Sequence, residues 1–184
     1  MDENGVVEED DGTWGALVVL AAKPHQIVLP WHKYQWRLCV SYQKLNQVTR
    51  PFTFPIPLCD DSVQDIDTEE KYFISVYMDS GYWQVVAEEE ARERLKLFTP
   101  DGKRRWKVIT IGELNAAPTF VAMIMKLQME WETLAKERGL KNVASKIIVG
   151  DVLLYGYTAE QILAYFRTVL DFLKHHRATL KLKK

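Results

Sequence analysis

In the stretch Ser145-Lys-Ile-Ile-Val-Gly-Asp-Val-Leu-Leu-Tyr155, two strongly apolar segments flank one glycine and one acid. This pattern predicts a β-hairpin with Gly150 and Asp151 at its tip. Asp151 would then lie at the end of two apolar strands. Since Asp is also a favoured turn former, the position alone leaves open whether this acid is a turn residue or a functional one.

A second acid, Asp79, stands at a similar place earlier in the chain. Residues 71–78 and 82–87 read as strands, and Asp79-Ser80-Gly81 between them predicts another hairpin. Two carboxylates on neighbouring hairpins of one sheet are ligands of the kind that Mg²⁺ prefers. The simpler interpretation, that both acids are turn residues, also stays open.

The remaining segments predict an α+β fold with an antiparallel sheet and helices on one face. The other predicted strands cover residues 14–22 (buried), 36–42, 95–99, 105–111 and 180–184, the last without a partner strand. The strands at 95–99 and 105–111 are expected to pair, because Pro100-Asp101-Gly102 between them has the composition of a turn. Helices are predicted at residues 62–67, 117–136 and 159–176, the last with Thr158 as its N-cap.

The composition is that of a globular protein, with 184 residues, 47% of them hydrophobic and 27% charged. The longest apolar run, residues 16–22, is too short to cross a bilayer, which takes about 20 residues. The two cysteines, Cys39 and Cys59, make neither a disulfide scaffold nor a zinc-binding spacing. We therefore expect an intracellular protein without a membrane span.

The net charge of −1 conceals an acidic N-terminus. Residues 1–12 carry six acids and no base, so the net charge of the rest is +5. We expect residues 1–13 to form a flexible, solvated leader, with the alternative that they cover a basic surface. Residues 14–184 are expected to form the folded domain.

From Trp36 onward the chain resembles the fingers and palm of a reverse transcriptase, the RNA-directed DNA polymerase of a gypsy-type long-terminal-repeat retrotransposon. The motifs that carry the resemblance occur in the order of the family: Trp36-Arg-Leu-Cys-Val-Ser-Tyr-Gln-Lys-Leu-Asn46, Phe54-Pro-Ile-Pro57, Asp79-Ser-Gly-Tyr-Trp-Gln84, Phe98-Thr-Pro-Asp-Gly102, Gly112-Glu-Leu-Asn-Ala116 and Val149-Gly-Asp-Val-Leu-Leu154. The resemblance implies a fingers/palm fold that ends before a thumb.

The resemblance also implies RNA-directed DNA synthesis by two-metal nucleotidyl transfer, with Mg²⁺ as the cofactor. The three metal-binding carboxylates of the family fall on Tyr77, Gly150 and Asp151, so Asp151 is the sole retained catalytic and metal-binding candidate. Asp79 is an unlikely substitute, because two residues along a strand displace it by about 6.6 Å from position 77. We therefore expect a degenerate site that does not bind Mg²⁺ productively and a chain without polymerase activity, a pseudoenzyme.

Three residues match nucleotide-binding positions of the family. Arg37 corresponds to a residue that grips the triphosphate, Tyr82 to one that packs under the sugar, and Gly112 to the loop that approaches the nucleotide. An arginine that holds phosphate is physically reasonable, because its guanidinium forms bidentate, charge-assisted hydrogen bonds. For Tyr82, the alternative of a plain packed aromatic residue stays open.

Two further functions are compatible with the sequence. In the first, the palm scaffold is reused as a structural or interaction subunit that docks onto protein partners in a larger assembly. In the second, the chain is a passive and weak binder of RNA or DNA through basic residues such as Lys103, Arg104, Arg105 and Lys107.

Overall fold

The computed structural model describes residues 5–22, 36–56, 66 and 72–182. The chain divides into two compact units, residues 1–51 with 85–116 (the first unit) and residues 52–84 with 117–184 (the second unit). Each unit contains one β-sheet. Apart from residue 66, the predicted helix at 62–67 lies outside the described residues.

The first unit contains a five-stranded sheet with the order β1-β6-β5-β2-β3. Its strands are β1 (Val7–Glu9), β2 (Ala16–Ala22), β3 (Trp36–Val40), β5 (Lys96–Thr99) and β6 (Gly102–Trp106). The hairpin predicted around Pro100-Asp101-Gly102 is confirmed as β5 and β6. The sheet is not wholly antiparallel, because β2 runs parallel to β5. Two short helices complete the described part of this unit, α1 (Gln43–Val48) and α3 (Glu89–Arg92).

The prediction that residues 14–22 form a strand is confirmed, but the prediction that this strand is buried is wrong. β2 is a strand, but Leu17 is 68% exposed, and Val19 and Leu20 are exposed as well. On the neighbouring strand β3, Trp36 and Leu38 are also exposed. The apolar sequence predicted the strand correctly, whereas its burial depends on what packs against it.

We expected the acidic N-terminal segment to be a flexible, solvated leader, but its described residues, from Gly5 on, include strand β1 of the sheet. Strand β1 pairs with β6, and Val6 and Val7 are buried. The Glu8 carboxylate lies 2.7 Å from Arg105 Nε, and the Glu9 carboxylate lies 2.9 Å from Arg104 Nη1. The two valines anchor the strand in the core, and its acids cover a basic strand, as in the alternative interpretation.

Asp10 extends this pairing into the protein interior. Its Oδ1 lies 2.9 Å from Lys96 Nζ, and the two side chains are only 5% and 7% exposed. Burial tends to raise the pKa of the Asp10 carboxyl group, but hydrogen bonds from Lys96 and from the backbone N–H of Gly12 outweigh this effect. The pKa of Asp10 therefore lies below its ordinary value.

Replacing Asp10 with Asn is expected to lower the thermal stability at neutral pH but not at strongly acidic pH. The pKa of Asp10 is lower in the folded protein than in the unfolded chain. The ionised carboxylate therefore stabilises the fold at every pH above the pKa that Asp10 has in the unfolded chain. This contribution is lost as the pH falls through the pKa that Asp10 has in the folded protein. The melting temperatures of wild type and variant therefore converge only at that strongly acidic pH. Circular dichroism melts across this range test it, with Asp101→Asn in the exposed β5–β6 turn as the charge-matched control. A difference in melting temperature between wild type and Asp10→Asn that stays constant down to the lowest pH would contradict the lowered pKa of Asp10.

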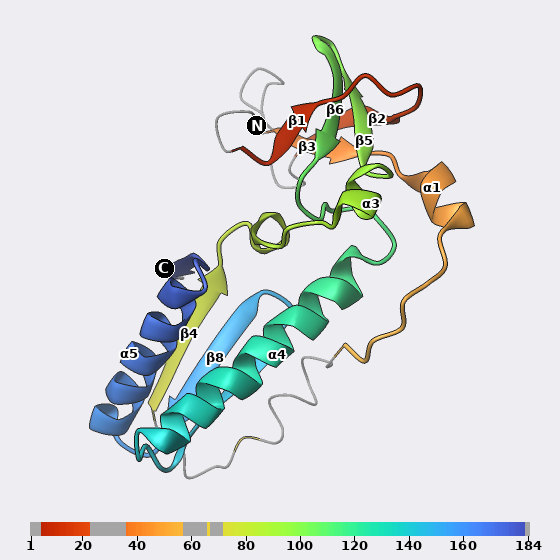
Figure 1. The fold of residues 1–184 in the computed structure, drawn as a ribbon. Helices are drawn as coiled ribbons and strands as arrows, with labels where there is room; N and C mark the ends of the chain where they lie inside the picture. Colours follow the sequence, from red (N-terminus) through yellow and green to blue (C-terminus); the bar gives the residue numbers. More distant parts are fainter. Residues whose placement is uncertain (1–4, 23–35, 57–65, 67–71, 183–184) are drawn as a thin grey trace. The chain divides into compact units, whose positions relative to one another are not determined.

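The second unit is a four-stranded antiparallel sheet with helices on one face, as predicted (Figure 1). The strand order is β7-β8-β4-β9, with β7 (Val143–Ile148), β8 (Asp151–Gly156), β4 (Tyr72–Met78) and β9 (Leu180–Leu182). Helices α4 (Ala116–Glu137) and α5 (Ala159–His175) run alongside β4 and β8 in Figure 1. Among the described helices, none is long and apolar enough to span a membrane.

Both long helices agree with their predicted ranges. The Thr158 side chain accepts a hydrogen bond from the backbone N–H of Gln161 at 3.2 Å, which confirms it as the N-cap of α5. The helix-covered face of the sheet includes Val76, Val152 and Leu154, all completely buried. Because side chains alternate along a strand, their neighbours Tyr77, Asp151 and Leu153 belong to the other face.

Two predictions about the edges of this sheet are wrong. Strand β9 does have a partner, because Leu180–Leu182 pairs with residues 76–78 of β4. Residues 82–87 do not form a strand paired with β4; a 3-10 helix, η4 (Gly81–Gln84), follows the turn instead. The pattern of residues 82–87 matches a strand, but Val86 makes only an isolated bridge, to Val108.

Candidate functional site

Asp151, the acid on which the predicted site depends, is the first residue of β8. The register places it directly opposite Tyr77 of β4, which in turn stands opposite Lys181 of β9. Directly opposite residues of antiparallel strands have Cβ atoms about 5 Å apart, so these three side chains form one row across the sheet. We call this side of the sheet, with Phe73, Ser75, Tyr77, Lys146, Asp151 and Lys181, the outer face.

The tip of the β7–β8 hairpin is Val149-Gly150, one residue earlier than the predicted Gly150-Asp151. Val149 has a φ of +57°, which is unfavourable for a β-branched residue. The backbone N–H of Met78 donates to the Gly150 carbonyl at 2.9 Å and ties the tip to the end of β4. The predicted site residues of the two strands are therefore brought together.

The ring of Tyr77 lies directly against Gly150. A Cβ atom at position 150 would be 3.2 Å from Tyr77 Cε2 and 3.7 Å from its Cζ. The aromatic ring thus occupies the space into which a side chain at 150 would project. Tyr77 and Gly150, which stand where the reverse-transcriptase pattern has metal-binding carboxylates, are therefore complementary in shape.

The residues present do not fit a pair of magnesium ions. Mg²⁺ is held by carboxylates and water in octahedral geometry, and of positions 77, 150 and 151 only Asp151 supplies a carboxylate. Position 77 carries an aromatic ring, which lies where a side chain at position 150 would project, so neither position supplies a carboxylate oxygen. Across residues 5–22, 36–56, 66 and 72–182, no group of three His, Cys, Asp or Glu side chains is placed to hold a metal ion.

Asp79 follows the end of β4 and lies in a turn, beside the start of β9. Its backbone N–H donates to the Thr179 carbonyl at 3.2 Å. The Gln84 side chain joins the same two segments: its amide group donates to the Asp79 and Thr179 carbonyls and accepts from the Thr179 N–H at 2.8 Å. Ser80, with a φ of +51°, turns the chain into η4. This geometry fits the interpretation of Asp79 as a turn residue.

Tyr82 packs against the first turns of α4. Its ring centroid lies 5.1 Å from that of Phe120, and a Cβ atom on the preceding Gly81 would be 2.7 Å from Phe120 Cζ. Burial raises the pKa of the Tyr82 hydroxyl, and nearby Tyr77 adds to the shift. The contact with Phe120 supports the alternative of a packed aromatic residue, which needs no nucleotide.

Arg37 and Gly112 belong to the first unit. Arg37 lies in β3, opposite Ala21 of β2. Gly112 has a φ of +100°, and a Cβ atom there would be 3.2 Å from the Val40 carbonyl oxygen, so a glycine is required. The Asn46 side chain holds this loop, because it donates to the Gly112 carbonyl and accepts from the Leu114 N–H, at 2.9 and 3.0 Å. The requirement for glycine at 112 is therefore structural.

The basic strand β6 is paired with acids on both sides. Besides Glu8, Arg105 contacts Glu89 of α3 at 2.6 Å and also Glu93. Lys96 of β5 lies 2.9 Å from Glu93, in addition to its pairing with Asp10. The acids around Arg105 and Lys96 outnumber the two cations. The sequence showed the basic run but not these partners, because they come from the N-terminus and from α3.

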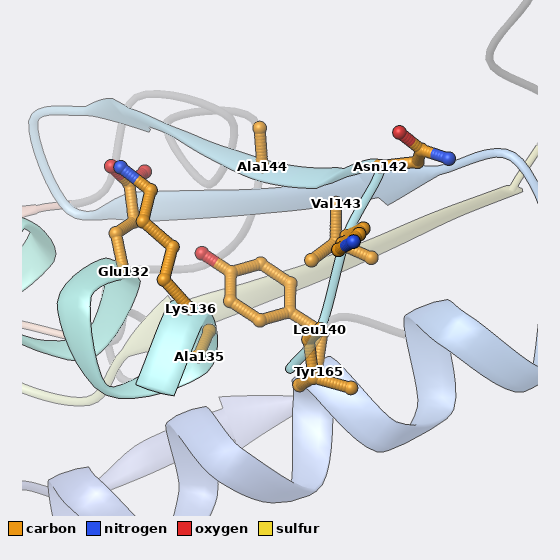
Figure 2. A pocket seen from close by; sticks show the side chains of 9 residues that line it. Glu132, Ala135, Lys136, Leu140, Asn142, Val143, Ala144 and Tyr165 are labelled. Carbon is orange, nitrogen blue, oxygen red and sulfur yellow. The ribbon is translucent and has the colours of Figure 1, made fainter. Parts of the chain in front are cut away.

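A cavity of about 470 Å³ lies in the second unit, beside the C-terminal turns of α4 (Figure 2). Glu132, Lys136, Leu140, Val143 and Tyr165 are among its lining residues. None of the predicted site residues lines it. The cavity and the row that contains Asp151 are therefore distinct places in the unit.

Comparisons with known proteins find retroelement sequences. No protein-family model matches the chain. It is 25% identical over 122 residues to the retrovirus-related Pol polyprotein from transposon opus of Drosophila melanogaster, across 66% of this chain and 12% of that protein. It is 28% identical over 95 residues to an RNA-directed DNA polymerase homolog of Oenothera berteroana, across 52% of this chain and 66% of the relative. The enzymatic polyprotein of cauliflower mosaic virus is 27% identical over 148 residues, 20% of its length.

Solved structures match nearly the whole chain. The protease–reverse transcriptase of prototype foamy virus superposes with a TM-score of 0.78 at 18% identity, covering 99% of this chain and 22% of that one. A foamy viral protease–reverse transcriptase in complex with double-stranded DNA superposes with a TM-score of 0.79 at 15% identity, covering 98% and 28%. The chain therefore has the fold of reverse-transcriptase fingers and palm, and it spans a minor part of the length of these viral and transposon proteins.

Proposed function

We propose that this chain, which has a reverse-transcriptase fold, is a fingers/palm domain of gypsy-type retroelement origin that has lost its metal site and with it RNA-directed DNA synthesis. Residues 14–184, together with strand β1 that pairs with β6, are the part proposed to correspond to the domain, with Arg37, Tyr82 and Gly112 at nucleotide-contact positions of the family. The similarity to Pol polyproteins supports the origin.

The observation that carries the loss of activity is the contact between Tyr77 and Gly150. Two replacements at separate positions would each remove one carboxylate, but here the ring of one fills the space beside the other. Restoring an acid at position 150 alone would place its side chain against that ring. The two positions are therefore coupled, and a single substitution at either position does not restore the metal site.

Divalent-cation binding tests this proposal directly. The wild-type chain is expected to bind Mn²⁺ weakly, whereas Tyr77→Asp combined with Gly150→Asp is expected to bind it about 100-fold more tightly or better. Even groups that only support metal ligands are typically worth 10- to 100-fold in affinity, so two direct ligands should be worth at least that. Electron paramagnetic resonance of free Mn²⁺ measures both constants.

Single variants and one control complete this experiment. Gly150→Asp alone is expected to lower the melting temperature, because its side chain meets the Tyr77 ring, and Tyr77→Asp in the same chain should relieve the loss. Asp151→Asn in the doubly substituted chain should abolish the new site. Tight Mn²⁺ binding by the wild type that requires Asp151 would refute the proposed loss.

A structural or interaction subunit is the second candidate function. The described residues of β2 and β3 expose large apolar side chains, namely Leu17, Val19, Leu20, Trp36 and Leu38. The register and the alternation along each strand put Leu20, Trp36 and Leu38 on one face of the sheet, and exposed apolar side chains gathered on one face are typical of surfaces that dock onto another protein. Passive nucleic-acid binding through β6 has less support, because Arg104 and Arg105 are paired with acids of the same unit.

A further inference from the structure

Helix α5 has exposed apolar side chains on a side that does not pack against the sheet. The side that contacts β4, β7 and β8 is marked by the buried residues Ile162, Val169 and Leu173. Leu163 is nevertheless 50% exposed, and Leu170 is 38% exposed. Because seven residues make almost two turns of an α-helix, these two leucines lie on the same side, one above the other. They form an apolar stripe that the sheet does not cover.

Cationic side chains alternate with these leucines. Arg167 lies between the two leucines, and Lys174 follows the second leucine by four residues, a spacing that places both cations on the side of the stripe. Among the residues that the structure describes, no acid lies within ion-pair distance of either cation. Asp171, the acid of α5 nearest to both in sequence, lies 3.5 Å from Arg138 instead. Both cations are therefore available to carboxylates of another molecule.

The stripe leads into a hollow of about 450 Å³ at the C-terminal end of α5. The turn after the helix shapes this hollow: Arg177 has a φ of +56°, and the backbone N–H of Ala178 donates to the Leu173 carbonyl at 2.9 Å. The lining residues are mostly apolar, include two cations and contain no acid, namely Leu170, Leu173, Lys174, Arg177, Ala178, Thr179 and Leu180. The hollow therefore has room for a large apolar side chain and cations beside it for an acidic one.

We propose that this α5 surface, formed by Leu163, Arg167, Leu170, Lys174 and the hollow, docks an acidic amphipathic helix of a partner protein. The apolar side of the partner helix covers the two leucines and inserts one side chain into the hollow, as in other complexes in which a helix lies in a groove. Its carboxylates pair with Arg167, Lys174 and Arg177. This proposal goes beyond the loss of polymerase activity, and it extends the second candidate function to a surface of the second unit.

Charge and apolarity together favour this occupant over two others. A second copy of the chain would bring the cations of one α5 surface against those of the other, which is unfavourable. A nucleic acid would pair its phosphates with the cations but would leave Leu163 and Leu170 without an apolar partner. An acidic helix with an apolar side satisfies both parts of the surface.

Fluorescence anisotropy tests the proposal with a labelled synthetic peptide that has leucines at helical spacing and glutamates between them. The wild-type chain is expected to bind this peptide more tightly than a scrambled peptide of the same composition. Leu170→Ala should weaken binding by about tenfold, because Leu170 belongs to both the stripe and the hollow. Lys174→Glu should weaken it by about tenfold or more, because it sets like charges against each other. A peptide with lysines in place of the glutamates should prefer the Lys174→Glu variant to the wild type.

Two variants of α4 are the matched controls and should leave binding unchanged. Met129→Ala removes an exposed apolar side chain, and Lys136→Glu reverses a charge in the last turn, as Lys174→Glu does in α5. Circular dichroism checks that each variant is folded, and Leu163→Ala replaces Leu170→Ala if the latter unfolds.

Three results would each overturn the proposal. The ordered peptide binds no more tightly than the scrambled one, Met129→Ala weakens binding as much as Leu170→Ala, or a DNA oligonucleotide binds the α5 surface more tightly than the peptide does. None of these variants changes Tyr77, Gly150 or Asp151, so this outcome is separate from that of the Mn²⁺ experiment.

Discussion

Primer extension by this chain, with either Mg²⁺ or Mn²⁺, is expected to stay on the order of 10⁴-fold or more below that of a reverse transcriptase assayed in parallel. The reaction needs two cations that activate the primer hydroxyl and stabilise the leaving pyrophosphate. Loss of a ligand costs several kcal/mol of transition-state stabilisation, and each 1.36 kcal/mol is a factor of ten in rate. Two of the three ligand positions here are Tyr77 and Gly150.

Asp151→Ala is the informative variant in this assay. If the site has lost its function, the wild type and Asp151→Ala give the same background signal, since one carboxylate cannot hold the pair of ions. Incorporation that is measurable in the wild type and disappears in Asp151→Ala would show that the remaining acid still works in catalysis. Restoring both acids, by contrast, tests whether the rest of the chain still supports a metal site.

Ser145→Ala is expected to lower the free energy of unfolding by about 3 kcal/mol, a large effect for the loss of one hydroxyl group. Ser145 Oγ accepts hydrogen bonds from Trp131 Nε1 of α4 and from the Tyr165 hydroxyl of α5, both at 3.1 Å, and donates to Glu132 at 2.8 Å. This one hydroxyl joins both long helices to β7. Without it, the buried Trp131 and Tyr165 donors lose their acceptor.

Urea unfolding of Ser145→Ala and of Ser75→Ala separates this effect from a change in β propensity. Ser75 lies on β4 and is exposed, so the same substitution there should cost little. Tyr165→Phe combined with Ser145→Ala should cost less than the sum of the two single changes, because both remove the same hydrogen bond. Burial raises the pKa of the Tyr165 hydroxyl to about 12, so it remains a donor throughout the experiment. Equal effects at positions 145 and 75 would contradict the role of this hydroxyl.

The two long helices and two of the hairpins were predictable because their signals are local. Apolar residues at helical spacing, the Thr158 cap and the Pro100-Asp101-Gly102 turn act within a few neighbouring residues. The resemblance assigned Tyr77 and Asp151 to metal-ligand positions of the family, and the register places the two residues opposite each other. The turn at Asp79 was assigned to a hairpin because the residues after it match a strand, whereas contacts of Gly81 and Tyr82 with Phe120 favour the 3-10 helix.

From the sequence alone one can predict the fold class, the two long helices, the hairpins at residues 95–106 and 143–156, and the residues that depart from the polymerase pattern. The three-dimensional structure was needed to show that Glu8 and Glu9 pair with Arg105 and Arg104 of β6, that β9 pairs with β4, that β2 exposes Leu17, Val19 and Leu20, and that the ring of Tyr77 fills the space beside Gly150. Periodicity and turn preference arise between neighbours in the chain, so they can be read along it. Burial, ion pairing and the contact of one side chain with another depend on partners tens of residues away, and a single sequence does not specify which partners meet.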